Sequence, residues 1–322
     1  MSGELRFDDQ VAVITGAGGG LGRQYALLLA SRGARVVVND IGGSVTGQGS
    51  DAAAAGAVVD EIRNRGGAAV ADNHSVTNPE GGQAIVDTAL SAWGRIDIVI
   101  NNAGIVRDAP FEDMTADRFE PLLDVHLKGA CYVTRPAWKA MCEQGYGRIL
   151  NTCSAAGILG AAGMSNYGSA KAGLIGLTRV LAAEAAGRDI KVNAIAPIAH
   201  TRMLVHSLDG AAQPDGPAAQ AVLDDLVGPY LRRLDPASVA PVAAYLTHRD
   251  CAVSGEIYTV GAGQVSRFFI GRTKGFYRPG LSIEDVRDHL DEIRDEAGYT
   301  VPGGAADEMS ELFATLTAGF SS

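Results

Sequence analysis

The sequence predicts an α/β fold, a doubly wound parallel sheet of seven strands with helices on both faces. Three observations lead to this prediction. Short apolar runs rich in β-branched residues alternate with longer segments of helical periodicity, as in repeated strand–helix–strand units. The first such run passes directly into a glycine-rich stretch, Gly16 to Gly22, that precedes a helical pattern. The 322 residues, 47% of them hydrophobic, suffice for one large domain and an appendage.

The predicted strands are short, apolar and without alternation, which is typical of strands buried on both faces. They are Val11–Thr15, Arg35–Asn39, Ala68–Ala71, Ile96–Ile100, Arg148–Thr152, Lys191–Ala196 and Ile257–Val260. We expect right-handed crossovers between them, so that one edge of the sheet collects the carboxyl ends of the strands.

Helical segments connect these strands. They are predicted from the glycine turn to Gly33, at Ala52–Arg65, at Pro79–Trp93, at Thr115–Gly145 with a kink at Pro136, from Tyr167 to Gly187, and at Pro236–His248. The segment Arg202–Arg233 is mixed in character, and its apolar residues suit either a substrate cleft or a plain surface helix. We predict a core domain over residues 1–265 and a helical C-terminal extension over 266–322, with helices at Ser282–Ala297 and Ala305–Leu316.

Composition excludes several kinds of partner. A net charge of −10 disfavours nucleic acid, since phosphate groups would be repelled. No apolar run reaches 18 residues and the N-terminus lacks a signal pattern, so we expect no membrane association. The four cysteines are scattered and no histidine cluster is present, which predicts a reducing cytoplasm and no metal.

The glycine stretch is a candidate dinucleotide site. Its predicted cofactor-binding residues are Gly16, Gly18, Gly20, Leu21 and Gly22. Glycines permit a tight turn and a close approach of the backbone to a pyrophosphate, which would rest on the N-terminus of the following helix. The alternative is an ordinary glycine-rich turn. The predicted strand before the glycines and the predicted helix after them favour the dinucleotide site.

Asp40, at the end of the second strand, indicates the type of cofactor. A carboxylate there accepts hydrogen bonds from the ribose hydroxyls and repels a 2′-phosphate, which favours NAD over NADP. A surface acid at a strand end is the alternative. Arg23 gives contrary evidence, because a base in the glycine turn would accept a phosphate.

Tyr167 and Lys171 are candidate catalytic residues. They stand at i and i+4 on a predicted helix, so they share one face. A nearby ammonium is expected to lower the pKa of the tyrosine hydroxyl, which would then serve as a base, while Ser154 donates to a substrate oxygen. The alternative is a half-buried ring with a lysine stem packed along it.

Taken together, these motifs resemble the short-chain dehydrogenase/reductase family, a Rossmann-type group of oxidoreductases. The resemblance rests on Thr15-Gly16-x-x-x-Gly20-x-Gly22, on Asn101-Asn102-Ala103-Gly104, and on Ser154 with Tyr167 and Lys171. It covers about Phe7 to Gly263. It implies a proton transfer by Tyr167 and a hydride transfer to NAD, with Lys171 also binding the nicotinamide ribose. It further implies contacts to the cofactor from Ser75, Val76, Asn102, Ala103, Gly104, Pro197, Ile198 and Thr201.

His126 departs from the family pattern. Most members carry an asparagine at this position, which helps to hold a water molecule linking the lysine to solvent. A histidine ring nitrogen can donate to such a water, and His126 is therefore a candidate catalytic residue. A packed, satisfied core histidine is an equally good interpretation.

This histidine, the long loop after Asp40 and the Tyr146-Gly147-Arg148-Ile149 stretch narrow the resemblance to one branch. The branch comprises the (3R)-hydroxyacyl-CoA dehydrogenase units of peroxisomal multifunctional enzymes type 2, also known as 17β-hydroxysteroid dehydrogenases type 4, and bacterial stand-alone relatives. It implies a 3-hydroxyacyl-CoA substrate and a homodimer or homotetramer formed through helices 115–145 and 164–186. Free hydroxysteroids are the alternative substrates. A non-catalytic NADH sensor and an NADPH-dependent ketoreductase are alternatives of other kinds, disfavoured by Ser154 and Asp40 respectively.

Overall fold

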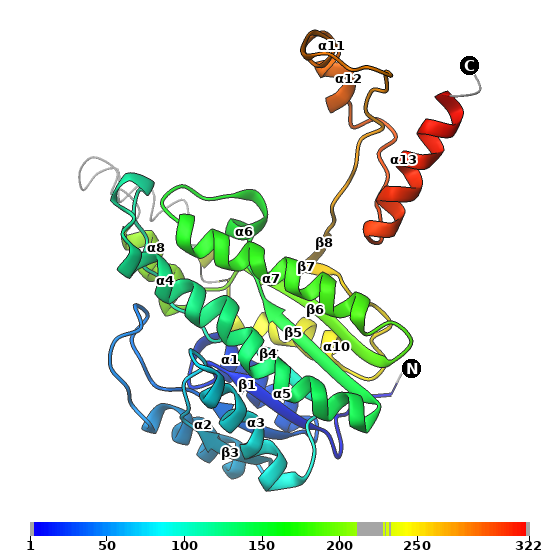
Figure 1. Ribbon diagram of the computed structural model, residues 1–322. Coiled ribbons are helices and arrows are strands. Elements are labelled where there is room, and N and C mark those ends of the chain that lie inside the picture. Colours follow the sequence, from blue (N-terminus) through cyan, green and yellow to red (C-terminus); the bar gives the residue numbers. More distant parts are fainter. Residues whose placement is uncertain (1–2, 211–227, 229, 232, 320–322) are drawn as a thin grey trace. The chain divides into compact units, whose positions relative to one another are not determined.

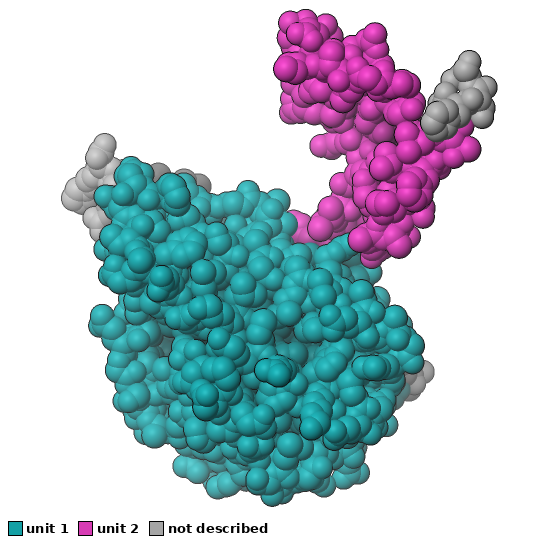
Figure 2. Space-filling view, viewed as in Figure 1, with its two compact units in different colours: residues 1–267 teal, residues 268–322 magenta. Residues whose placement is uncertain are grey.

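The computed structural model describes residues 3–210, 228, 230–231 and 233–319. The chain divides into two compact units, residues 1–267 and residues 268–322 (Figure 2). No helix among the described residues is long and apolar enough to cross a membrane.

A single sheet forms the centre of the first unit (Figure 1). Its strands lie in the order β3-β2-β1-β4-β5-β6-β7-β8, which reverses direction beside β1 as in doubly wound folds. The bounds are β1 Val11–Thr15, β2 Arg35–Asn39, β3 Ala68–Asp72, β4 Ile98–Asn101, β5 Tyr146–Thr152, β6 Asp189–Pro197, β7 Ile257–Gly261 and β8 Gln264–Phe268. Strands β1 to β7 pair in parallel throughout. The predicted fold class is therefore confirmed.

The eighth strand was not predicted. It follows β7 after a two-residue turn at Ala262 and Gly263, whose φ angles of 49° and 84° are both left-handed. Such a turn favours a hairpin. The outward residues of β8 are exposed and mostly polar, so the strand lacks the apolar run that identifies the buried strands.

Helices cover both faces of the sheet. On one face lie α1 Gly20–Ser31, α2 Ala53–Asn64 and α10 Ala240–Thr247, and on the other α3 Pro79–Trp93, α5 Gly129–Gln144 and α7 Ser165–Glu184. Each face buries its own apolar cluster. Burial of apolar side chains on both faces contributes the main favourable free energy of the fold.

The predicted long helix Thr115–Gly145 is three segments in continuous helical conformation. They are α4 Ala116–Leu122, a π-helical turn Leu123–Lys128, and α5. Gly145 ends α5 in a left-handed conformation, as predicted. The π-turn, which sequence periodicity cannot reveal, contains His126. Single π-turns inside helices are frequent at functional sites.

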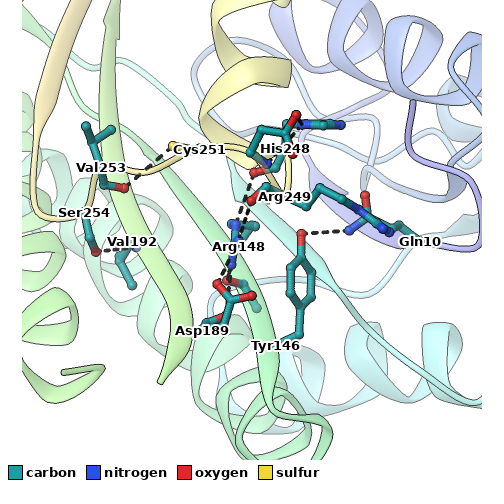
Figure 3. Close-up of polar contacts among 12 residues, drawn as sticks. Gln10, Tyr146, Arg148, Asp189, Val192, His248, Arg249, Cys251, Val253 and Ser254 are labelled. Atoms are coloured by element: carbon teal, nitrogen blue, oxygen red, sulfur yellow. Dashed lines mark hydrogen bonds and ion pairs between the residues drawn. The ribbon is translucent and has the colours of Figure 1, made fainter. Parts of the chain in front are cut away.

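A buried arginine joins three segments at the amino ends of β5 and β6 (Figure 3). Arg148 is only 1% exposed, and its guanidinium donates to the carbonyl oxygens of Gly147, Asp189, His248 and Arg249 at 2.9–3.2 Å. It also pairs with the Asp189 carboxylate at 2.9 Å. The buried charge is therefore fully hydrogen-bonded, and it ties the loop after α10 to the sheet.

The second unit contains α11 Ile283–Asp288, α12 Leu290–Arg294 and α13 Ala305–Gly319. The predicted helix Ser282–Ala297 is thus broken at His289. Its start is correct, because Ser282 and Asp285 form a reciprocal capping box. Of the mixed segment Arg202–Arg233, the helix α8 Arg202–Gly210 is described, whereas residues 211–227, 229 and 232 lie outside the described residues.

Candidate active site at the carboxyl ends of the strands

Ser154 and Tyr167 meet where β5 ends. Ser154 caps the short helix α6 Ala155–Leu159, and its hydroxyl accepts a hydrogen bond from the Ala156 nitrogen at 3.2 Å. Helix α6 lies directly on the backbone of α7, since a methyl group on Gly157 would sit 2.6 Å from the Ala172 nitrogen. This close packing brings Ser154 near Tyr167, and the serine hydroxyl acts to lower the pKa of the tyrosine.

Lys171 lies beneath this pair. Its side chain is buried, and its ammonium donates to the Thr152 carbonyl oxygen at 2.5 Å and lies 5.4 Å from the centroid of the Tyr167 ring. Burial lowers the pKa of Lys171 to about 8. The spacing of Ser154, Tyr167 and Lys171 along the sequence therefore does correspond to one cluster in space.

The expected effect of Lys171 on Tyr167 is not seen in the chain by itself. Burial raises the pKa of the Tyr167 hydroxyl to about 12, and the Ser154 hydroxyl offsets only part of that rise. Lys171 points to the Thr152 carbonyl instead of to the tyrosine oxygen, so we correct that expectation. Desolvation acts on both groups and favours their neutral forms.

His126 contacts the same cluster from the π-turn. Its ring packs edge-on against Tyr167, with centroids 5.1 Å apart, and a methyl group on Gly104 would lie 2.5 Å from it. The Nε2 atom lies 2.8 Å from the Ile105 carbonyl oxygen and 3.2 Å from the Ile105 nitrogen, so it donates to the first or accepts from the second according to the tautomer of the ring. Burial and the charge of Lys171 hold the pKa of His126 well below its ordinary range. The histidine is thus neutral and anchored on one side.

The other ring nitrogen of His126 borders a small internal cavity. The cavity offers about 10 Å³ to the centre of a water molecule, about the minimum for holding one. His126 Nδ1 and Asn101 Oδ1 are buried without a hydrogen-bond partner among the described residues, and both residues line the cavity together with Lys171. The site therefore presents the Asn101 carbonyl oxygen, one ring nitrogen of His126 and Lys171 to a single water molecule.

The predicted cofactor loop has the backbone that its glycines suggest. Gly16 has a φ of 64°, and side chains at Gly16 and Gly22 would lie 2.7 and 2.3 Å from neighbouring backbone atoms. Gly20 and the partly buried Leu21 open α1. The loop is braced from β4, because Asn102 donates to the Thr15 and Gly16 carbonyl oxygens at 3.0 and 3.1 Å.

That bracing gives Asn102 a supporting position. The Thr15 hydroxyl oxygen accepts hydrogen bonds from the backbone nitrogens of Asn102 and Ala103, at 3.0 and 3.1 Å. Sequence reasoning left Thr15 out of the candidate site, although its place at the start of the glycine motif was a usable signal.

Asp40 reaches the glycine loop. Its carboxylate accepts hydrogen bonds from the backbone nitrogens of Gly18 at 2.8 Å and Gly42 at 2.7 Å. Arg23, the base that would favour a phosphate, forms an ion pair with Glu61 of α2, with 2.5 Å between Arg23 Nη2 and Glu61 Oε2. Two charged groups therefore lie near the predicted ribose position. One is the Asp40 carboxylate, held by two backbone nitrogens, and the other is the Arg23 guanidinium, which is paired with Glu61.

The remaining candidates differ in their accessibility. Val76 is buried against Gly129 and lines the small cavity, whereas Ser75 bonds to Thr77 near the surface. Pro197 ends β6 and is followed by Ile198, whose side chain is about half exposed. Thr201 places its methyl group 3.7 Å from where a Cβ on Gly20 would lie. All these segments lie at the carboxyl ends of strands. No group of three potential metal ligands occurs among the described residues.

The burial of Lys171 predicts how the stability of the protein depends on pH. A lysine whose pKa falls from 10.5 to about 8 on folding binds fewer protons in the folded than in the unfolded state between those values. Its burial therefore costs free energy below pH 8, and this cost shrinks as the pH rises towards 10. Relative to Lys171→Met, the wild-type chain should gain roughly 2 kcal/mol of stability between pH 7 and pH 10.

Urea unfolding of both proteins across this pH range measures the difference. Because Tyr167 is present in both, its own titration cancels. A difference that does not change with pH would show that Lys171 keeps an ordinary pKa.

The comparisons with known proteins agree with this geometry. Residues 10–209 match the family described as short chain dehydrogenase. The chain is 43% identical over 307 residues to peroxisomal multifunctional enzyme type 2 of Mus musculus, a match over 94% of this chain and 39% of that protein. It is also 43% identical over 298 residues to a short-chain type dehydrogenase/reductase of Mycobacterium tuberculosis, over 92% of this chain and 97% of that protein.

Solved structures give the same picture. The full-length peroxisomal multifunctional enzyme type 2 of Drosophila melanogaster superposes with a TM-score of 0.78 at 36% identity, over 98% of this chain and 50% of that one. A 7α-hydroxysteroid dehydrogenase complexed with NADH and 7-oxo glycochenodeoxycholic acid gives a TM-score of 0.68 at 32% identity, over 80% of this chain and 95% of that one. This chain thus spans only part of the multifunctional proteins that it matches.

Members of the matched family are oxidoreductases that generally bind a nicotinamide cofactor and act on small molecules. The residues at the carboxyl ends of the strands fit such a cofactor, since the glycine loop leaves its backbone open and the N-terminus of α1 has no acidic residue in its first turn. This chain belongs to the short chain dehydrogenase family and is an oxidoreductase.

Proposed function

We propose that this chain oxidises the secondary alcohol of a 3-hydroxyacyl-CoA to a ketone with NAD, as a step of fatty-acyl or sterol side-chain β-oxidation. The observation that carries the proposal is the grouping of Ser154, Tyr167 and the buried Lys171 at the carboxyl end of β5, where Lys171 is bonded to the Thr152 carbonyl oxygen and lies 5.4 Å from the Tyr167 ring. A protein that only bound the dinucleotide would have no need of a serine and a tyrosine hydroxyl grouped beside a buried lysine. The sensor alternative is therefore less well supported.

In this mechanism Tyr167 removes the hydroxyl proton of the substrate, and Ser154 holds the same oxygen as it becomes a carbonyl. A bound nicotinamide ring supplies the hydride acceptor. Lys171, with its pKa of about 8, needs little driving force to pass a proton, and the small cavity beside it is bordered by His126 Nδ1. We propose that His126 holds a water molecule there, in place of the asparagine expected in the family.

The choice of NAD follows from charge. An added 2′-phosphate would approach the Asp40 carboxylate, which two backbone nitrogens hold in place. Arg23, which could have offset the repulsion, is paired with Glu61. Both observations also count against an NADPH-dependent ketoreductase.

The choice of an acyl-CoA rests on similarity. Peroxisomal multifunctional enzymes and peroxisomal hydratase-dehydrogenase-epimerases match this chain at 40–45% identity over 85–99% of its length, whereas a 3-oxoacyl-[acyl-carrier-protein] reductase matches at 35% over 80%. A free hydroxysteroid remains the second candidate, because the 7α-hydroxysteroid dehydrogenase has the same fold.

The decisive experiment measures NADH or NADPH formation from (3R)- and (3S)-hydroxyacyl-CoAs of several lengths and from free hydroxysteroids. We expect turnover of the thioesters with NAD and at least tenfold lower kcat/KM with NADP. Asp40→Asn, which removes only the charge, should reduce the difference in kcat/KM between NAD and NADP. Turnover of free steroids alone would replace the proposed substrate, and binding of NADH without any turnover would favour the sensor.

A further inference from the structure

Arg202 lies over the glycine loop, although no sequence motif singles it out. It opens α8, directly after Thr201, whose hydroxyl oxygen accepts a hydrogen bond from the Leu204 nitrogen at 3.3 Å. A methyl group on Gly19 would lie 3.6 Å from a terminal nitrogen of the Arg202 guanidinium. With Thr201 against Gly20, the start of α8 therefore faces the N-terminus of α1.

Within the part of the chain that the structure describes, the Arg202 guanidinium has no acidic partner at this contact, and the nearby Asp40 carboxylate is bonded to the backbone nitrogens of Gly18 and Gly42. No carboxylate among the described residues lies within 4 Å of the Arg202 guanidinium, in contrast to Arg23 and its partner Glu61. Helix α1 is 12 residues long and starts without an acidic residue in its first turn, and its N-cap, Gly19, has no side chain to satisfy the free backbone N–H groups. A cation and the positive end of a helix dipole thus share one patch in an otherwise acidic chain.

We propose that Arg202 binds the diphosphate of the dinucleotide and closes it against the glycine loop. The inference rests on the proposed use of a dinucleotide at this site. A guanidinium presents two parallel N–H donors that match two phosphate oxygens, while the backbone N–H groups at the start of α1 bind the opposite side of the same group. Arg202 is then a cofactor-binding residue that acts on affinity and takes no part in proton transfer.

The role differs from that of the neighbouring Thr201, which the family resemblance assigns to the nicotinamide end. Arg202 contacts Gly19, at the entrance to α1, where the phosphates of a dinucleotide would lie. Its contribution must therefore depend on the phosphates and must be absent for ligands that lack them.

Fluorescence titration with NADH tests the proposal on the full chain. Arg202→Gln should raise the Kd for NADH about tenfold or more, the effect of losing one charge-assisted pair. Arg202→Lys keeps the positive charge but lacks the two parallel N–H donors of the guanidinium. It should bind NADH more tightly than Arg202→Gln but less tightly than the wild type. The matched control is Arg249→Gln, an exposed arginine in the loop that Arg148 ties to the amino ends of the strands, at the opposite end of the sheet from the glycine loop. It should leave the Kd unchanged.

Competition experiments with pieces of the cofactor identify the group that Arg202 binds. The dissociation constant of ADP, obtained from its displacement of NADH, should rise in Arg202→Gln by about the same factor as that of NADH. The dissociation constant of adenosine should be the same in the wild type and in Arg202→Gln. An unchanged Kd for NADH in Arg202→Gln, while the wild type binds normally, overturns this inference alone. A wild-type chain that binds no NADH overturns the proposed function as well.

Discussion

Tyr167→Phe is expected to lower kcat by about a thousandfold or more, because it removes the group proposed to accept the substrate proton. The change is confined to one oxygen atom. The phenyl ring can keep its edge-on contact with His126, and Lys171 can keep its bond to the Thr152 carbonyl. The Kd for NADH should therefore stay within a factor of about two.

Steady-state kinetics and an NADH titration on the same preparation separate the two effects. Ser154→Ala is the companion variant. It should also lower kcat, but less, because Tyr167 retains its hydroxyl and loses only the neighbouring serine hydroxyl that acts to lower its pKa. Retention of a tenth or more of the wild-type kcat by Tyr167→Phe would exclude Tyr167 as the proton acceptor.

Arg148→Met is expected to lower the free energy of unfolding by about 3–5 kcal/mol. Replacing a buried ion pair by an apolar residue can be nearly neutral, but here four backbone carbonyl oxygens would lose the arginine as a donor, although the His248 oxygen still accepts from the Cys251 nitrogen at 3.0 Å. Each orphaned buried carbonyl costs roughly 1–3 kcal/mol, which relaxation and water entry reduce. The loop after α10 should therefore detach from the sheet early in unfolding.

Urea denaturation measures the effect, and Asp189→Asn is the matched control. The Asp189 side chain is 55% exposed, so loss of its charge should cost less than about 1 kcal/mol. Arg148 lies at the opposite end of β5 from Thr152, and kcat per folded molecule should stay the same in both variants. Equal destabilisation by the two changes would mean that the ion pair, and not the carbonyl cluster, stabilises this region.

Much of the fold was predictable because its signals are local. Strands such as Val11–Thr15 and Arg35–Asn39 are continuous apolar runs buried on both faces, and their predicted bounds agree with the structure. The glycine loop was predictable for the same reason, since each glycine reports a backbone requirement at its own position. The eighth strand was missed because it is mostly polar and exposed.

The candidate site was predictable only where its members are close in sequence. Tyr167 and Lys171 share a helix face, and the segment from Ser154 to Tyr167 is short, so spacing alone placed them together. Glu61 and Arg202 carry no such signal. Each comes near the glycine loop or its neighbouring helix through packing between elements distant in the sequence.

The sequence by itself determined the order of strands and helices, the glycine turn and the Ser–Tyr–Lys set, because these depend on residue type and short spacing. Only the tertiary structure decided the ionisation of the set. Burial, which no local pattern records, raises the pKa of Tyr167 and lowers that of Lys171. It also decided that His126 stands in a π-turn with one ring nitrogen anchored and the other facing a water-sized cavity. Desolvation and long-range contacts are properties of the folded chain as a whole, so no local sequence pattern could have shown them.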